Sequence, residues 1–157
     1  MDLMTSALAL NSNYATSRTS TKKASFDNKQ AAKPQFGLNI LMVEDDRLCQ
    51  LIQKNLLESY GCHVDIADSG EQALLMFNTQ YDAIVLDINL PGISGLDVSK
   101  AIRSHKNGKN IPIFGLSSEA EAKHDECLHA GYSEMLAKPV NAQQLTSLLA
   151  SYFTTAE

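Results

Sequence analysis

The chain has 157 residues, of which 44% are hydrophobic, and this is typical of one globular domain with an ordinary core. Its net charge of -5 is uneven, because residues 1–37 carry five basic and two acidic residues, whereas the rest carries eight basic and sixteen acidic ones. Contacts with nucleic-acid phosphates need clustered Lys and Arg, so this acidic remainder argues against a nucleic acid as partner.

Residues 1–36 are rich in Ser, Thr, Asn and Lys and show neither helical nor strand periodicity. This composition predicts a disordered tail or linker, followed by one domain over residues 38–155. The start, Met1-Asp2-Leu3-Met4, lacks the basic region of a secretory signal, although an organellar transit peptide stays open as an alternative.

From Asn39 onward, short apolar runs alternate with amphipathic stretches, a pattern typical of repeated βα units. Strands are predicted at 40–43, 63–67, 83–87, 111–116 and 134–137. The helices that follow them are predicted at 46–59, from 69 onward, from 95 to before 107, at 119–130 and at 142–152. Parallel strands need crossover helices and cross over right-handed, so we expect a parallel sheet with helices on both faces.

Sequence signals also predict how the first two helices pack and end. Leu48, Ile52 and Leu56 recur at helical spacing and predict the apolar face of the first helix, and Gly61 suits a left-handed stop. Ser69 is expected to cap the second helix, with Gln72 completing a capping box.

The three cysteines, Cys49, Cys62 and Cys127, form no C-x-x-C pair and have no histidine at zinc-ligand spacing. We therefore expect reduced thiols and a cytoplasmic protein. No apolar run approaches the roughly 18 residues of a membrane-spanning helix, so no membrane span is expected.

Acidic residues stand where two predicted strands end. Glu44 and Asp45 follow the first strand, and Asp87 ends the third. Because the carboxyl ends of parallel strands share one edge, these carboxylates can converge, and two charges about 4 Å apart repel by roughly 4 kcal/mol at an effective dielectric near 20. Such a cluster needs a cation, and oxygen ligands favour Mg²⁺. The alternative is that acids merely begin a helix, which we accept for Asp46.

A lysine and a hydroxyl complete the set of polar groups at this edge. Lys138 ends the last strand, and the following Pro139 disfavours helix at that lysine, so the lysine can reach Asp87 or an incoming anion. Ser117 ends the fourth strand and could donate a hydrogen bond to a phosphoryl oxygen. The alternative is that Ser117 or Ser118 caps the next helix, an interpretation we favour for Ser118.

In this order the residues resemble the receiver domains of two-component response regulators, over residues 38 to about 155. The likeness rests on Glu44 and Asp45, on Asp87 within Leu86-Asp87-Ile88-Asn89-Leu90-Pro91-Gly92, on Ser117, and on Lys138-Pro139. The resemblance implies a flavodoxin-like (βα)5 fold, a doubly wound α/β sheet with strand order 2-1-3-4-5.

The resemblance also implies chemistry. A phosphohistidine of a histidine kinase or a histidine phosphotransfer protein would donate its phosphoryl group to Asp87. Mg²⁺ would be held by Asp45, Asp87 and the backbone carbonyl of Asn89, with Glu44 acting through water. Lys138 would neutralise charge, and Ser117 would bind the attached phosphoryl group and draw in its loop. The domain would catalyse only its own phosphorylation and dephosphorylation, as a monomer or weak dimer.

Two departures and two alternatives qualify this resemblance. Ser117 stands where threonine is commoner, a mild departure because the hydroxyl is kept. Met135 stands where receivers often carry an aromatic switch residue, and the stretch from Ala130 to Val140 is similar to that of receivers in hybrid sensor kinases. This favours a relay receiver. A pseudo-receiver that is not phosphorylated is the first alternative, and a phosphatase with an aspartate nucleophile is the second; catalytic turnover of a phosphate ester would favour the latter.

Overall fold

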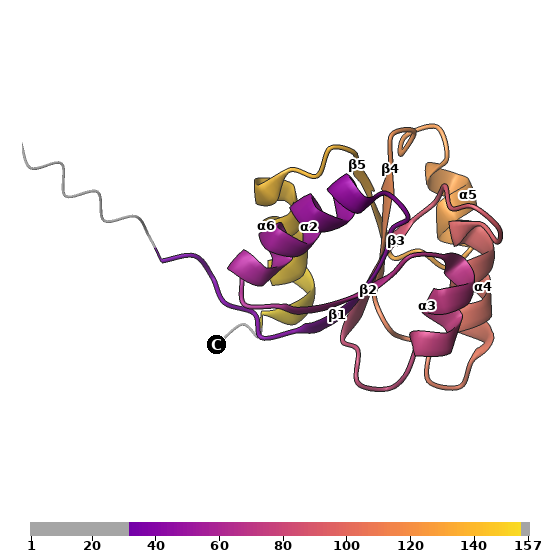
Figure 1. The fold of residues 1–157 in the computed structure, drawn as a ribbon, viewed down its shortest axis with the longest axis horizontal. Coiled ribbons are helices and arrows are strands. Elements are labelled where there is room, and N and C mark those ends of the chain that lie inside the picture. Colours follow the sequence, from indigo (N-terminus) through magenta and orange to yellow (C-terminus); the bar gives the residue numbers. More distant parts are fainter. Residues whose placement is uncertain (1–31, 155–157) are drawn as a thin grey trace, which may run out of the picture. The chain divides into compact units, whose positions relative to one another are not determined.

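The computed structural model describes residues 32–154, which contain a five-stranded parallel sheet (Figure 1). Its strands lie in the order β2-β1-β3-β4-β5, so the expected flavodoxin-like order is confirmed. The strands are β1 (Asn39–Val43), β2 (His63–Ala67), β3 (Ala83–Asp87), β4 (Ile113–Ser117) and β5 (Glu134–Ala137). All five therefore point their carboxyl ends to one edge.

Helices cover both faces of the sheet, with α2 and α6 on one face and α3, α4 and α5 on the other (Figure 1). They are α2 (Arg47–Ser59), α3 (Gly70–Met76), α4 (Gly95–Ser104), α5 (His124–His129) and α6 (Ala142–Phe153). This is the doubly wound arrangement that repeated βα units predict.

Each face of the sheet has its own hydrophobic core, and the central strands β1 and β3 contribute to both. In β1, Leu41 and Val43 pack into one core, whereas Ile40 and Met42 pack into the other. A strand covered on both faces needs apolar residues at every position, which explains the unbroken apolar runs in the sequence. The polar residues that end these strands are therefore held on a rigid base.

Side chains cap the helices largely as predicted. The Asp46 carboxylate accepts the backbone N–H of Cys49 at 2.8 Å and begins α2, and this hydrogen bond lowers the pKa of Asp46. The Ser69 hydroxyl accepts the N–H of Gln72 at 3.1 Å, but the Gln72 side chain accepts the N–H of Asp68 rather than that of the capping serine. Gly61 has a φ of 78° and ends α2 in the left-handed region.

The predicted apolar face of α2 was wrong for Leu48 and Ile52, whereas Leu56 does pack against the core. Leu48 and Ile52 are 65% and 56% exposed, and the buried residues of this helix are Gln53 and Leu57. The buried stripe is thus shifted by one residue from the predicted one. Polarity misled the prediction, because Gln53 turns inward to the buried carboxylate of Glu44, which pattern reasoning does not anticipate.

The segment around β4 also differs from its prediction. The strand begins at Ile113 rather than at residue 111, since Pro112 has no N–H for the ladder and contributes its carbonyl to Ile84 instead. The next helix was predicted at 119–130, but α5 begins only at His124, after turns over residues 119–123. Ser118 therefore does not cap it, and Lys123 at its amino end provides no capping hydrogen bond.

Most of the predicted tail, residues 1–31, lies outside the described residues. The described part closest to the sheet contacts α2: the N–H of Phe36 donates to the carbonyl of Tyr60 at 2.8 Å, and Phe36 packs against the core beneath α2 and α6. In residues 32–154, no helix is both long enough and apolar enough to cross a membrane.

Replacing Tyr132 with phenylalanine is expected to raise the free energy of unfolding by about 1 kcal/mol. Tyr132 is buried, its hydroxyl has no hydrogen-bond partner among the described residues, and burial raises the pKa of this hydroxyl. Tyr81→Phe is the matched control, since the Tyr81 hydroxyl donates to Asp65 at 2.7 Å, and we expect it to lower stability. Urea denaturation measures both, and a destabilised Tyr132→Phe would contradict the expectation.

Candidate functional site

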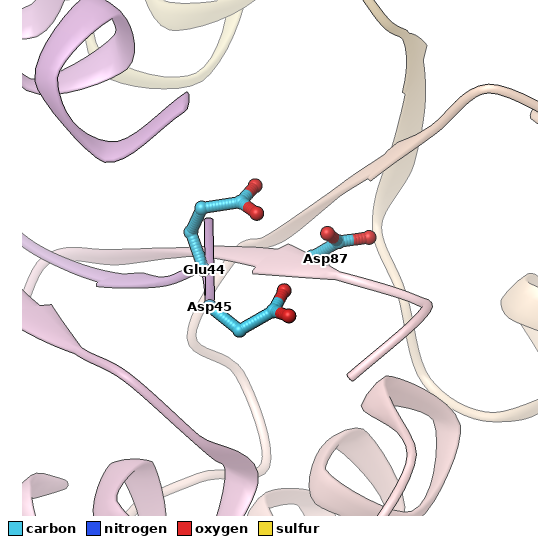
Figure 2. A group of neighbouring side chains, drawn as sticks. All are labelled: Glu44, Asp45 and Asp87. Carbon is cyan, nitrogen blue, oxygen red and sulfur yellow. The ribbon is translucent and has the colours of Figure 1, made fainter. Parts of the chain in front are cut away.

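Three carboxylates meet at the carboxyl edge of the sheet. Glu44 and Asp45 directly follow β1, and Asp87 ends β3, which pairs with β1 so that Val43 faces Leu86. One carboxylate oxygen of each lies within 4.8 Å of those of the other two, and Figure 2 shows the three side chains turned toward a common space. Glu44 and Asp87 are buried at 1% and 4% exposure, whereas Asp45 is exposed.

The ammonium group of Lys138 joins two of these carboxylates. Its Nζ lies 2.7 Å from Asp87 Oδ2 and 2.9 Å from Glu44 Oε2, although 51 and 94 residues of chain separate the partners. Burial by itself lowers the pKa of Lys138, but the hydrogen bonds that Lys138 donates to Asp87 and Glu44 outweigh it and leave that pKa raised. Lys138 is therefore charged when it faces the two acids.

Glu44 is the most enclosed of the three acids. Burial raises its pKa, and the charge of Asp87 adds to this, while the hydrogen bond from Lys138 opposes both. Its Oε1 accepts the N–H of Asp46 at 3.2 Å, and its Oε2 accepts Gln53 Nε2 at 3.4 Å in addition to Lys138. Both oxygens of the Glu44 carboxylate therefore accept hydrogen bonds from groups of the protein itself.

The loop after β3 folds back on Asp87. The N–H of Asn89 donates to Asp87 Oδ1 at 3.1 Å, so one carboxylate oxygen faces this turn and the other faces Lys138. Gly95, the first residue of α4, donates its N–H to the carbonyl of Ile88 at 2.9 Å and holds the loop against the helix.

Ser117 is fully buried at the end of β4, between β3 and β5. Its carbonyl accepts the N–H of Lys138 at 3.0 Å, which ties the two strand ends together. Its hydroxyl accepts the N–H of Glu119 at 2.9 Å and closes the turn that replaces the predicted helix start. Of the two sequence interpretations, capping of α5 by Ser117 is therefore wrong.

These groups form a set of oxygen donors suited to Mg²⁺. Three carboxylates converge, one of them open to solvent, and hard oxygen ligands with access to water are what this ion takes in proteins. The predicted residues Glu44, Asp45, Asp87 and Lys138 do come together. Sequence reasoning missed Gln53, and no pattern signal could have found it, since a glutamine at a helix position reads as solvent-facing.

Comparison with known protein families agrees with the geometry of this site. Residues 40–150 match the family described as the response regulator receiver domain. The chain belongs to the receiver-domain family. The chain is therefore a receiver domain of two-component signalling, and receiver domains are signalling modules rather than classical enzymes.

Curated relatives of this receiver domain include sensor kinases. The chain is 33% identical over 126 residues to the aerobic respiration control sensor protein ArcB of Escherichia coli, covering 79% of this chain and 16% of ArcB. It is 26% identical over 159 residues to histidine kinase 5 of Arabidopsis thaliana, covering 83% of this chain and 17% of that protein. The receiver domain thus spans about a sixth of the length of these relatives.

Solved structures agree. The receiver domain of a sensor histidine kinase from Pseudomonas aeruginosa, with a magnesium ion coordinated in its active-site cleft, has a TM-score of 0.70 and 33% identity, covering 76% of this chain and 99% of that one. A chemotaxis protein of Vibrio cholerae has a TM-score of 0.68 and 28% identity, covering 74% of this chain and 98% of that one.

Proposed function

We propose that this receiver domain accepts a phosphoryl group on the carboxylate of Asp87 from a phosphohistidine of a partner protein. The observation that carries the proposal is the position of Asp87. Its carboxylate is buried, is hydrogen-bonded to Lys138, and lies beside two further carboxylates at the edge of the sheet. A buried acid with this surrounding has a functional rather than a structural explanation.

In the proposed reaction an Asp87 oxygen attacks phosphorus, the bond between phosphorus and the histidine nitrogen breaks, and the imidazole leaves. Phosphoryl transfer asks mainly for in-line positioning and neutralised charge. Lys138 lies 2.7 Å from the attacking carboxylate and supplies a positive charge to the phosphoryl oxygens. The Ser117 hydroxyl, held at the neighbouring strand end, donates a hydrogen bond to the attached group.

The residues that would hold Mg²⁺ in this proposal are Asp45, Asp87 and the backbone carbonyl of Asn89, with Glu44 acting through water. When bound, the ion would neutralise the crowded carboxylates and the negative charge of the phosphoryl oxygens. The magnesium ion in the Pseudomonas aeruginosa receiver, which is 33% identical to this chain, supports this assignment.

The proposed output is a change in the loops and the face around β4 and β5. The Ser117 hydroxyl can donate to the phosphoryl group while its oxygen still accepts the N–H of Glu119, so movement of this serine toward the phosphoryl group would draw the turn over residues 119–123 with it. This turn borders a groove of about 960 Å³ between the α5 segment, β5 and α6, lined in part by Met135 and Leu148. Movement of the turn would change the shape of the groove.

We further propose a place in a phosphorelay. The relatives include a sensor protein, ArcB, and histidine kinase 5, which supports a histidine kinase or a histidine phosphotransfer protein as donor. The cysteines at 49, 62 and 127 are all free, which suits a reducing cytoplasm. We propose residues 38–155 as the functional unit and a monomer or weak dimer as its state.

The test is to incubate the full chain with Mg²⁺ and a small phosphodonor, acetyl phosphate. Mass spectrometry then follows the mass of the intact protein over time. We expect one added phosphoryl group, which is then lost without any added phosphatase. It should be absent in Asp87→Asn and in the presence of a chelator. Asp125→Asn is the matched control, because Asp125 is a fully exposed acid on α5, and it should gain the group as the natural chain does.

Three results would contradict the proposal. A chain that never gains mass would favour the pseudo-receiver. Continuous release of phosphate from unrelated phosphate esters would favour the phosphatase. Mass gained equally by Asp87→Asn would place the acceptor elsewhere.

A further inference from the structure

Gln53 is a buried amide in an apolar setting. It lies on α2 at 5% exposure and lines a small internal hollow with apolar residues, namely Leu57, Val85, Leu116, Val140 and Leu145. Its Oε1 has no hydrogen-bond partner among the described residues. A buried amide oxygen without a partner has lost its hydrogen bonds to water and gained none in return, which is unfavourable for the core in which it lies. Packing alone does not explain it.

Within residues 32–154, the one side-chain hydrogen bond of the Gln53 amide is with Glu44 of the acidic cluster. Its Nε2 donates to Glu44 Oε2 at 3.4 Å, a long hydrogen bond inside the protein. The same oxygen accepts Lys138 Nζ at 2.9 Å, and Lys138 also holds Asp87. Glu44 therefore shares Lys138 with the proposed phosphoacceptor, whereas no other acid of the described residues forms a hydrogen bond with Gln53.

The neighbouring turn of α2 holds the main chain of Glu44 in place. Gln50 Nε2 lies 2.7 Å from the backbone carbonyl of Glu44 and 2.8 Å from Asp68 Oδ1, on the loop after β2. The two glutamines thus bind different parts of Glu44, since Gln50 binds its backbone carbonyl and Gln53 binds its carboxylate.

We propose that Gln53 is a positioning residue that keeps the Glu44 carboxylate aimed at the cation site, together with Lys138 in the free protein and in its place once Lys138 turns toward a phosphoryl group. This inference rests on the proposed function. Once Lys138 binds a phosphoryl oxygen, Glu44 retains two donors, the N–H of Asp46 and the amide of Gln53. Of these, the Gln53 amide contacts the oxygen that Lys138 leaves.

The test replaces Gln53 with methionine in the full chain. Methionine keeps the shape of the side chain but removes both the donor and the unpartnered oxygen. We expect unchanged or higher stability to urea without Mg²⁺, together with Mg²⁺ binding about tenfold weaker by calorimetry, as is usual when a group that orients a metal ligand is lost. Phosphorylation by acetyl phosphate should slow in parallel. Gln53→Leu provides a second apolar variant with the same expectation.

Leu57→Met is the matched control, because Leu57 lines the same hollow and its side chain has no polar group that could bind Glu44. It should lower stability and leave Mg²⁺ binding unchanged. Gln53→Met that loses stability and binds Mg²⁺ as the natural chain does would show a packing role and overturn the inference alone. A natural chain that binds no Mg²⁺ would overturn the proposed function as well.

Discussion

Replacing Lys138 with methionine is expected to lower the free energy of unfolding by about 3 kcal/mol at neutral pH without Mg²⁺. The substitution leaves Glu44 and Asp87, at 1% and 4% exposure, facing each other and Asp45 with no cation between them. Removing one partner of a buried ion pair costs far more than the pair contributes, because the remaining charges stay desolvated. Urea denaturation measures the loss.

The surface offers a matched control for this variant. Lys54 and Glu58 form an ion pair at 3.5 Å on α2, with both side chains more than a third exposed. Such pairs contribute about 0.5 kcal/mol or less, so Lys54→Met should be nearly neutral. Added Mg²⁺ should restore part of the stability of Lys138→Met, since a cation would again separate the carboxylates. Equal stabilities of the two variants would contradict the expectation.

The pH dependence of the Lys138→Met effect has a defined sign. The pKa of Lys138 is raised above its ordinary value of 10.5, so its contribution to stability is complete below that pH and is lost as the pH rises above it. The difference between the natural chain and the variant should therefore shrink in alkali. It should also shrink in acid, because protonation of Glu44, whose pKa is raised by burial, removes the repulsion in the variant.

Gly95→Ala is expected to lower the free energy of unfolding by about 2 kcal/mol, against the preference of helices for alanine. A Cβ at Gly95 would overlap the carbonyl oxygen of Asp87, and would lie 2.5 Å from the Tyr132 hydroxyl and 2.8 Å from the Cα of Ile88. Two of these three obstacles are backbone atoms of the segment that carries the proposed phosphoacceptor. Relief of the overlap must move either α4 or the end of β3.

Gly70→Ala is the control, because Gly70 also begins a helix but its Cβ would meet only side-chain atoms, of Ile93 and Val98. These side chains can shift, so we expect a smaller loss in urea denaturation. Phosphorylation of Gly95→Ala should also slow, since Asp87 is displaced, whereas Gly70→Ala should keep the natural rate. A Gly95→Ala chain as stable as the natural one would contradict this account.

Much of the fold and of the cluster was predictable from local patterns. Apolar runs of strand length, each ended by a polar residue, located four strands to within one residue, and β4 was misplaced only at its ends. Because parallel strands share an edge, Glu44, Asp45, Asp87 and Lys138 could be expected together, and their contacts confirm that they meet. The strand order came from the resemblance to receiver domains, since periodicity carries no information on order.

The predictions for the buried face of α2 and for the start of α5 failed for physical reasons. The exposed Leu48 and Ile52 and the buried Gln53 on α2 reverse the hydrophobic pattern, and the buried Gln53 amide donates to the buried carboxylate of Glu44. The late start of α5 has a similar origin. The Ser117 hydroxyl binds the N–H of Glu119 and holds in a turn a segment whose composition favours helix.

By itself the sequence determined the βα succession, the two-sided burial of the central strands and the chemical types of the groups at the strand ends. These properties depend on neighbouring residues, so a local pattern suffices to predict them. Only the tertiary structure decided that Lys138 donates hydrogen bonds to both Glu44 and Asp87, that Gln53 turns inward, and that Gly95 has no room for a Cβ. Each of these depends on distances between segments that are far apart along the chain and become neighbours only in the folded sheet.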